Sequence, residues 1–189
     1  MTNQAQMRLR DATQADHRRL EIRTDILARI ARPDERRALV EGFRVLHAEA
    51  EAALAPWLAD LPGLDFEARR RSDRLARDLA ALGGRPGSAA AERPIVANVA
   101  EALGRMYVLE GSTLGGQVIR RAVEARGDGM LGLSFLDPYG ARTGERWRAF
   151  LAVLDAHAAT PADTDAMIAG ARDGFRHAEH RLCGAMADV

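Results

Sequence analysis

Hydrophobic residues recur at three- and four-residue intervals along most of the chain, which is the spacing of one face of an α-helix. Nowhere do apolar and polar residues alternate as they do in a half-buried strand. The pattern predicts helices over residues 7–23, 25–31, 33–56, 66–82 and 94–126, a sixth beginning near 143 and a last one beginning at 161. We therefore expect an all-α fold, formed as one domain by residues 1–189.

Proline and capping residues mark several of the expected helix starts. Pro33 stands in the first turn of the third helix, and Pro94 is expected to begin the long helix. Thr143 is a candidate cap for the sixth helix. Thr160 and Pro161 form a strong start signal, because a capping side chain is followed by proline at the first helical position.

The middle of the long helix carries three glycines, Gly111, Gly115 and Gly116, with Ser112 and Thr113 between them. Each glycine inside a helix costs roughly 1 kcal/mol relative to alanine, so this cluster should bend the helix and requires a compensating contact. A neighbouring helix could pack closely on Gly111 and Gly115, or a flat ligand could lie against the bare backbone. The Ser112 hydroxyl could hold a water or bond to the carbonyl of the preceding turn. Spacing alone leaves both interpretations of the glycines open.

The first helix places His17 on one face with Arg10 and Thr13, and Glu21 follows one turn later. A histidine on such a face is more often a hydrogen-bonded core residue than a metal ligand. The carboxylate of Glu21 favours ligation, because a carboxylate one turn away can hold and orient an imidazole. Arg10 by itself would be one of many solvated arginines.

Other polar clusters have simpler interpretations. His177 and His180 could bind a metal, although a partly solvated helix face is the favoured reading. His47 is expected at the boundary of the core. The run from Arg69 to Arg71 is expected on a solvated face, because nearby aspartates offset its charge.

Charge and cysteine content exclude several classes of function. Lys+Arg and Asp+Glu both number 27, and a net charge of zero argues against nucleic-acid or membrane-surface binding. The single cysteine, Cys183, excludes an internal disulfide and a cysteine-based metal site. The N-terminus has no apolar signal core, and no segment approaches the ~18 apolar residues of a membrane span, so a cytoplasmic location is the simplest expectation. Phosphate-binding loops, Gly-x-Ser-x-Gly elbows and His-Glu-x-x-His motifs are absent.

Two segments taken together resemble the haem oxygenase family. Residues 9–21, LRDATQADHRRLE, resemble the proximal helix of that family, which carries the iron-binding histidine. Residues 107–119, YVLEGSTLGGQVI, resemble its distal helix and are most similar to the bacterial branch associated with phytochromes. Residues 135–175 also fit that branch in order and spacing. The resemblance covers nearly the whole chain and implies a single-domain helical bundle with a kinked, glycine-rich distal helix.

The resemblance assigns roles on the proximal side. His17 matches the iron ligand, and Glu21 matches the acidic residue that orients it. Arg10 falls where the family keeps a basic residue for a haem propionate. Arg148 is a candidate for the second propionate, with Arg146 as the alternative. The expected haem-binding set is completed by Thr13, Tyr107 and Phe175.

On the distal side, the resemblance implies that the backbone of Gly111, Gly115 and Gly116 lies against the haem face. Ser112 stands where mammalian members have an aspartate that organises distal water. Many bacterial members resemble this chain in having serine there. These four residues are therefore the expected catalytic set.

The implied function is oxidative cleavage of haem to biliverdin, ferrous iron and carbon monoxide, with haem as both cofactor and substrate. The reaction consumes O₂ and requires an external ferredoxin or flavoprotein reductase, because the chain has no flavin or nicotinamide fingerprint. A bacterial phytochrome is the biliverdin acceptor that the branch similarity suggests. The alternative is a non-catalytic haem- or bilin-binding protein on the same fold. A helical carboxylate metal protein would need paired Glu-x-x-His units, which the sequence lacks.

Overall fold

The structure is a computed structural model that describes residues 4–85, 87 and 94–184. The α-helices are α1 (Gln4–Thr24), α2 (Ile26–Ile30), α3 (Pro33–Leu58), α4 (Ser72–Ala81), α5 (Val99–Arg126), α6 (Thr143–Ala156) and α7 (Pro161–Cys183). Short 3₁₀ turns lie between them: η1 (Glu67–Arg69), η2 (Ser134–Leu136) and η3 (Gly140–Arg142). The described residues contain no strand, so the predicted all-α class is confirmed.

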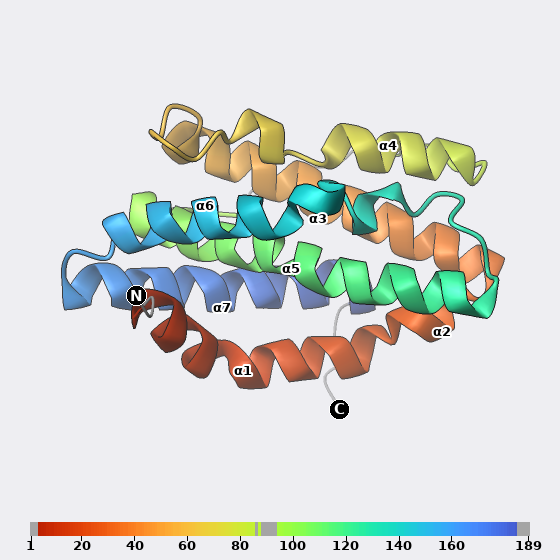
Figure 1. The fold of residues 1–189 in the computed structure, drawn as a ribbon, viewed down its shortest axis with the longest axis horizontal. Helices are drawn as coiled ribbons and strands as arrows, with labels where there is room; N and C mark the ends of the chain where they lie inside the picture. The colour runs from red at the N-terminus through yellow and green to blue at the C-terminus, as the bar shows by residue number, and fades with distance from the viewer. Residues whose placement is uncertain (1–3, 86, 88–93, 185–189) are drawn as a thin grey trace.

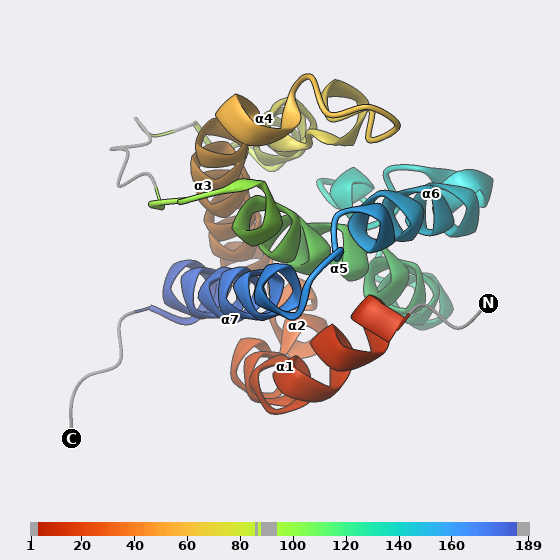
Figure 2. The same ribbon diagram turned by 90° about the vertical axis from the view of Figure 1, so that its left-hand side faces the viewer.

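Helices α5 and α7 form the centre of the bundle (Figure 1). Helix α1 packs on α7 and α6, whereas α3 and α4 cover the opposite side (Figure 2). Buried apolar side chains form two clusters, one around Phe66, Leu103 and Phe150 and the other around Leu39, Leu75 and Phe135. No helix in the described ranges is both long enough and apolar enough to cross a membrane.

The close approach of α5 and α7 depends on two glycines outside the cluster that the sequence singled out. A side chain at Gly104 would overlap the backbone carbonyl of Met167, and one at Gly170 would overlap that of Glu101. Backbone lies against backbone at this crossing, so any larger residue would push the helices apart. The central helix pair is therefore built on Gly104 and Gly170.

Capping explains where the two long helices begin. In α7, Thr160 and Asp163 form a reciprocal capping box ahead of Pro161, as the sequence predicted. In α5, the Asn98 side chain accepts a hydrogen bond of 2.9 Å from the backbone N–H of Glu101. The expected start at Pro94 was therefore wrong, because Asn98 caps the helix four residues later.

Three other boundaries differ from expectation. Helix α3 continues through Pro56 to Leu58, although Pro56 has no N–H to donate to the carbonyl of Ala52. The helix expected over 66–82 is divided into η1 and α4 by Arg70, whose backbone is extended. Thr143 is the first residue of α6 rather than its cap, and its hydroxyl donates 2.9 Å to the carbonyl of Gly140.

Candidate functional site

His17 lies on α1 with most of its side chain exposed. Its Nδ1 is 3.4 Å from Oε2 of Glu21, as the spacing of the two residues predicted, and the side chain of His17 is 59% exposed. The buried ring of Phe175, on α7, meets the imidazole edge-on with ring centroids 5.9 Å apart. Glu21 and Phe175 thus orient the ring, while Nε2 has no partner among the described residues and is available as a ligand.

The other expected residues of α1 differ in what they can offer a ligand. Thr13 is buried and its hydroxyl donates 2.7 Å to the carbonyl of Leu9, so this hydroxyl has no hydrogen left to donate to a ligand. Arg10 is exposed and has no ion-pair partner in the part of the chain that is described. Its charge acts on Tyr107 of α5: burial raises the pKa of the Tyr107 phenol, and the Arg10 charge lowers it. Arg10 of α1 therefore lies within electrostatic range of Tyr107 of α5.

The three glycines of α5 have three different surroundings, although the helix runs unbroken through them. A side chain at Gly111 would meet the Trp147 ring at 3.8 Å, which is an ordinary contact. A side chain at Gly115 would meet nothing within 4 Å, whereas one at Gly116 would overlap the carbonyl of Leu136 in η2. The structure therefore does not support close packing of a helix on Gly111 and Gly115. Gly116 is required by its contact with η2, and Gly115 presents bare backbone to open space.

Ser112 lies three residues before Gly115, on an exposed part of α5. Its hydroxyl donates 2.7 Å to the carbonyl of Leu109, which confirms the predicted bond to the preceding turn. The same oxygen accepts 3.2 Å from Nη1 of Arg71. The side chains of Leu114 and Val118 are also exposed in this half of α5, on other faces of the helix than Ser112.

The arginine run expected on a solvated face instead sends two of its members into the protein. Arg69 and Arg71 are 2% and 3% exposed, and only Arg70 is exposed. The extended backbone at Arg70 accounts for this, because successive residues of an extended segment point to opposite sides, which puts Arg69 and Arg71 on the same side. Both buried arginines reach the turn of α5 that contains Gly111.

Arg69 forms a buried ion pair with Glu110, the residue immediately before Gly111. Its Nη1 lies 2.5 Å from Oε2 of Glu110, and the Tyr139 hydroxyl donates 2.7 Å to Oε1 of the same carboxylate. Burial and then the charge of Glu110 raise the pKa of the Tyr139 phenol, so Tyr139 stays a neutral donor. Glu110 is thereby held by residues from η1 and from the segment before η3.

Glu51 of α3 holds the chain at the start of α4. Its carboxylate accepts hydrogen bonds from the backbone N–H of Arg71 at 2.6 Å and from the Ser72 hydroxyl at 2.6 Å. Burial alone would raise the pKa of Glu51, but hydrogen bonds from His47, Ser72 and the Arg71 backbone lower it to about 2. His47 is fully buried rather than at the core boundary, and burial followed by the charge of Arg71 lowers the pKa of its imidazole.

The two arginines of α6 considered for the second propionate differ in availability. Arg146 forms an ion pair of 2.8 Å with Asp65, and its guanidinium lies 5.3 Å from the centroid of the Tyr139 ring. Arg148 is exposed and has no partner among the described residues. Arg148 is therefore the one free to meet an anionic group.

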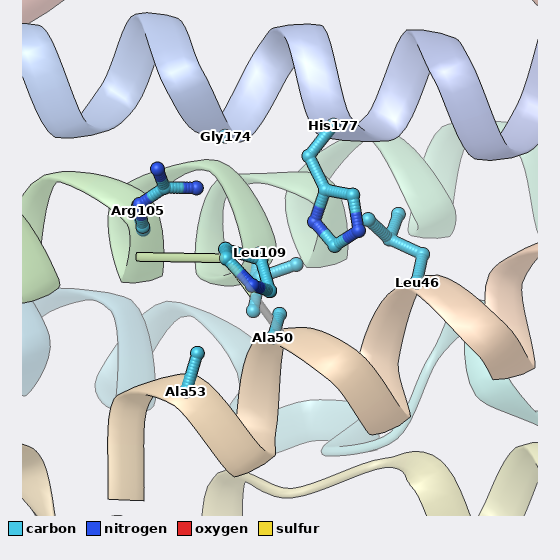
Figure 3. A pocket seen from close by; sticks show the side chains of 8 residues that line it. Leu46, Ala50, Ala53, Arg105, Leu109, Gly174 and His177 are labelled. Atoms are coloured by element: carbon cyan, nitrogen blue, oxygen red, sulfur yellow. The ribbon is translucent and has the colours of Figure 1, made fainter. Parts of the chain in front are cut away.

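His177 is hydrogen-bonded inside the bundle and does not lie on a solvated face. Its Nε2 lies 2.8 Å from a carboxylate oxygen of Glu49, and the described residues contain no cluster of three or more potential metal ligands. His177 and Arg105 point toward a cavity of about 10 Å³ between α3, α5 and α7 (Figure 3). A volume of this size suits about one water molecule and excludes a porphyrin.

Sequence reasoning missed the residues behind the glycine-rich turn: Arg69, Arg71, Glu51 and Glu110. One signal was present, because Glu110 interrupts the apolar stripe of α5 and a buried carboxylate requires a buried cation. The partner itself lies on another element, and spacing within one helix does not identify it.

Comparisons with known proteins agree with one another. A family model described as Heme oxygenase matches residues 3–180. A protein named Heme oxygenase from Xanthomonas campestris pv. campestris (strain 8004) is 36% identical over 162 residues, which cover 82% of this chain and 88% of that protein. The NO- and CO-bound haem oxygenase from Neisseria meningitidis has a similar crystal structure, with a TM-score of 0.78 and 26% identity over 97% of this chain and 94% of that one. The haem oxygenase from Leptospira interrogans shares the fold, with a TM-score of 0.75 and 19% identity over 98% and 100% of the two chains.

Proposed function

The chain belongs to the haem oxygenase family, and on that premise we propose that it cleaves haem to biliverdin, ferrous iron and carbon monoxide between His17 of α1 and the glycine-rich turn of α5. The observation that carries this placement is that the two residues implied for opposite faces of the haem are both available: His17 has an exposed imidazole oriented by Glu21, and Gly115 has exposed bare backbone. Haem supplies both the iron that activates O₂ and the porphyrin that is oxidised.

On the proximal side, His17 is the iron ligand through its free Nε2. Glu21 lies 3.4 Å from Nδ1 and favours the tautomer that carries its proton there, which leaves Nε2 as the ligating atom. The edge of Phe175 limits rotation of the ring. Arg10 and Arg148 have no competing ion pairs among the described residues, and they are the proposed partners of the two propionates.

On the distal side, Ser112 orders water instead of donating its own hydrogen. Its hydroxyl hydrogen is committed to the carbonyl of Leu109, and one lone pair is taken by Arg71. The remaining lone pair can only accept, so a water that donates to Ser112 keeps its second hydrogen for a neighbouring group. The open space at Gly115 gives that water and the porphyrin room against the backbone.

The proposed electron donor follows from the family, and the proposed biliverdin acceptor rests on the resemblance of residues 107–119 to the phytochrome-associated branch. Electrons come from a cytoplasmic ferredoxin or flavoprotein reductase. A bacterial phytochrome is the proposed acceptor of biliverdin.

An absorption experiment tests the activity and the ligand together. The haem complex is incubated with ascorbate or a reductase, and we expect the Soret band to fall while a biliverdin band grows. His17→Ala should keep its helical circular dichroism and lose biliverdin formation, because the iron loses its ligand. His180→Ala, which changes an exposed histidine of the same protein, is the matched control and should match the unmodified chain.

Two outcomes count against the proposal. A ferrous or ferrous–oxy complex that stays stable under reductant would make the protein a haem carrier or sensor. Full turnover by His17→Ala without added imidazole would remove His17 from the site.

A further inference from the structure

Arg71 is a buried cation without a carboxylate partner. Its guanidinium donates to the carbonyl of Leu109 and to the hydroxyl of Ser112, and its Nε has no hydrogen-bond partner. Within the described ranges no carboxylate lies at ion-pair distance from this group, although both neighbours in the run are paired: Arg69 with Glu110 and Arg70 with Glu67. Arg71 is therefore the member of the run whose charge is left uncompensated.

Such an arrangement is costly for the fold. A buried charge loses its hydration and normally recovers that energy from an ion pair. Glu51 does not fill this role, because it accepts from the backbone N–H of Arg71 and not from the guanidinium. A neutral donor could make the same two hydrogen bonds, to Leu109 and Ser112, at a lower desolvation cost. The charge of Arg71 therefore points to a role other than stabilising the fold.

The positive charge of Arg71 is directed at one exposed group. The charged and titratable side chains around it are Glu51 and His47 of α3, Glu110 of α5 and Tyr139 just before η3. Each of these has its own hydrogen-bond partner. Ser112 is the remaining contact, and it faces the open side of α5 beside Gly115. A charge in a water-poor setting acts more strongly on its neighbours than one in solvent.

Resting on the haem site proposed above, we infer that Arg71 makes the distal side of that site favour anionic over neutral iron ligands, by holding a positive charge directly behind Ser112. Arg71 does not touch the substrate and is a positioning residue that acts through Ser112. Its charge is in place before the reaction, so it stabilises negative charge that develops when O₂ is reduced there, without reorganisation.

Two iron ligands of different charge separate this role from a structural one. Azide binding to the ferric haem complex reports on an anion, and carbon monoxide binding to the ferrous complex reports on a neutral ligand. We expect Arg71→Gln to weaken azide binding about tenfold, since the charge is lost while a donor to Ser112 is kept. Carbon monoxide affinity should stay within about twofold, because a neutral ligand gains little from the charge.

Matched variants define the control. Arg71→Lys keeps the charge and should retain azide affinity to within about threefold. Arg70→Met removes the same charge from the adjacent exposed position and should change neither affinity by more than about twofold.

The inference is overturned if Arg71→Gln leaves azide affinity unchanged, or if it weakens azide and carbon monoxide equally. Equal loss would show that Arg71 only supports the shape of the site. Failure of the unmodified protein to bind or cleave haem would instead defeat the proposed function. Haem cleavage with an unchanged azide affinity in Arg71→Gln would defeat this inference alone.

Discussion

Gly115 and Gly116 are neighbours in the chain, but a side chain at each would meet different surroundings. Space at Gly115 is open, while the carbonyl of Leu136 occupies the space at Gly116. The second glycine is therefore required by the fold, whereas the first is not and is free for the proposed contact with haem. The sequence alone does not distinguish the surroundings of these two glycines.

Substitution at these two positions should separate ligand binding from stability. Gly115→Leu should leave the unfolding free energy of the apoprotein unchanged or higher, because leucine has roughly 1 kcal/mol better helix propensity and meets nothing. Haem affinity and turnover should fall, because the side chain fills the space against the backbone. Urea unfolding and haem titration by absorbance measure the two effects.

Gly116→Ala is the comparison variant. It should lower the unfolding free energy by about 2 kcal/mol, because a backbone carbonyl cannot move aside as a side chain can. Unchanged turnover in Gly115→Leu would mean that the open space at Gly115 is not used by haem.

At the level of elements, the junction of η1 and α4 fixes the glycine-rich turn of α5 in place. Arg69 and Arg71 leave this junction side by side and reach Glu110 and Ser112, the residues that flank Gly111. A helix weakened by glycine is thus held from outside at the point where its own propensity is lowest. Polar contacts from the junction therefore stabilise this turn of α5, where the glycines provide no side chains to pack.

The buried pair of Arg69 and Glu110 should show strong coupling in a double-mutant cycle. Arg69→Met should lower the unfolding free energy by about 3 kcal/mol or more, because it leaves the Glu110 carboxylate buried without its cation. Glu110→Gln should also destabilise, since the guanidinium then lacks its counterion. The double variant should recover much of the loss.

Equilibrium urea unfolding of all four proteins measures the coupling. Additive losses would show that the two side chains do not depend on each other. Arg70→Met is the control within the same run and should cost less than about 1 kcal/mol, because its guanidinium is exposed, its closer ion pair, with Glu67, is exposed, and its contact with the buried Glu51 is long at 3.4 Å.

Features set by local chemistry were predictable from the sequence, and those set by distant partners were not. The start of α7 followed from Thr160 and Pro161, and the pairing of His17 with Glu21 followed from their spacing in one helix. The burial of Arg69 and Arg71 depends on an extended residue and on acceptors from α5, which no helical periodicity encodes. The contacts of His17 on α1 were therefore predictable from the sequence, and the buried arginines that hold the glycine-rich turn of α5 were not.

Across the whole molecule, Glu51 joins α3 to the junction that supports α5. Its carboxylate binds the backbone at Arg71 and the side chain of Ser72, and His47 lies 3.4 Å from it. The stability of the bundle and the geometry of the distal turn therefore depend on one ionised group. Protonation of that group should affect both.

Acid should weaken the fold through Glu51, and the sign follows from its pKa. The folded-state pKa is about 2, below the ordinary value of 4.5, so the contribution of Glu51 is complete above pH 4.5 and is lost as pH falls toward 2. At about 1.4 kcal/mol per pKa unit, the full contribution is about 3 kcal/mol. His47 acts in the same direction, because its lowered pKa makes the unfolded chain take up a proton first as pH falls below 6.5.

Urea unfolding of the unmodified chain and of Glu51→Gln between pH 7 and pH 2.5 should isolate this effect. The difference in unfolding free energy between the two proteins should be largest above about pH 4.5 and should shrink as the pH falls, because a protonated Glu51 resembles glutamine. Glu67→Gln is the control, since that carboxylate is 67% exposed and should give a difference that is small at every pH. A difference for Glu51→Gln that stays constant across this range would show that the fold does not depend on the charge of Glu51, and the acid sensitivity would then have to arise at another carboxylate.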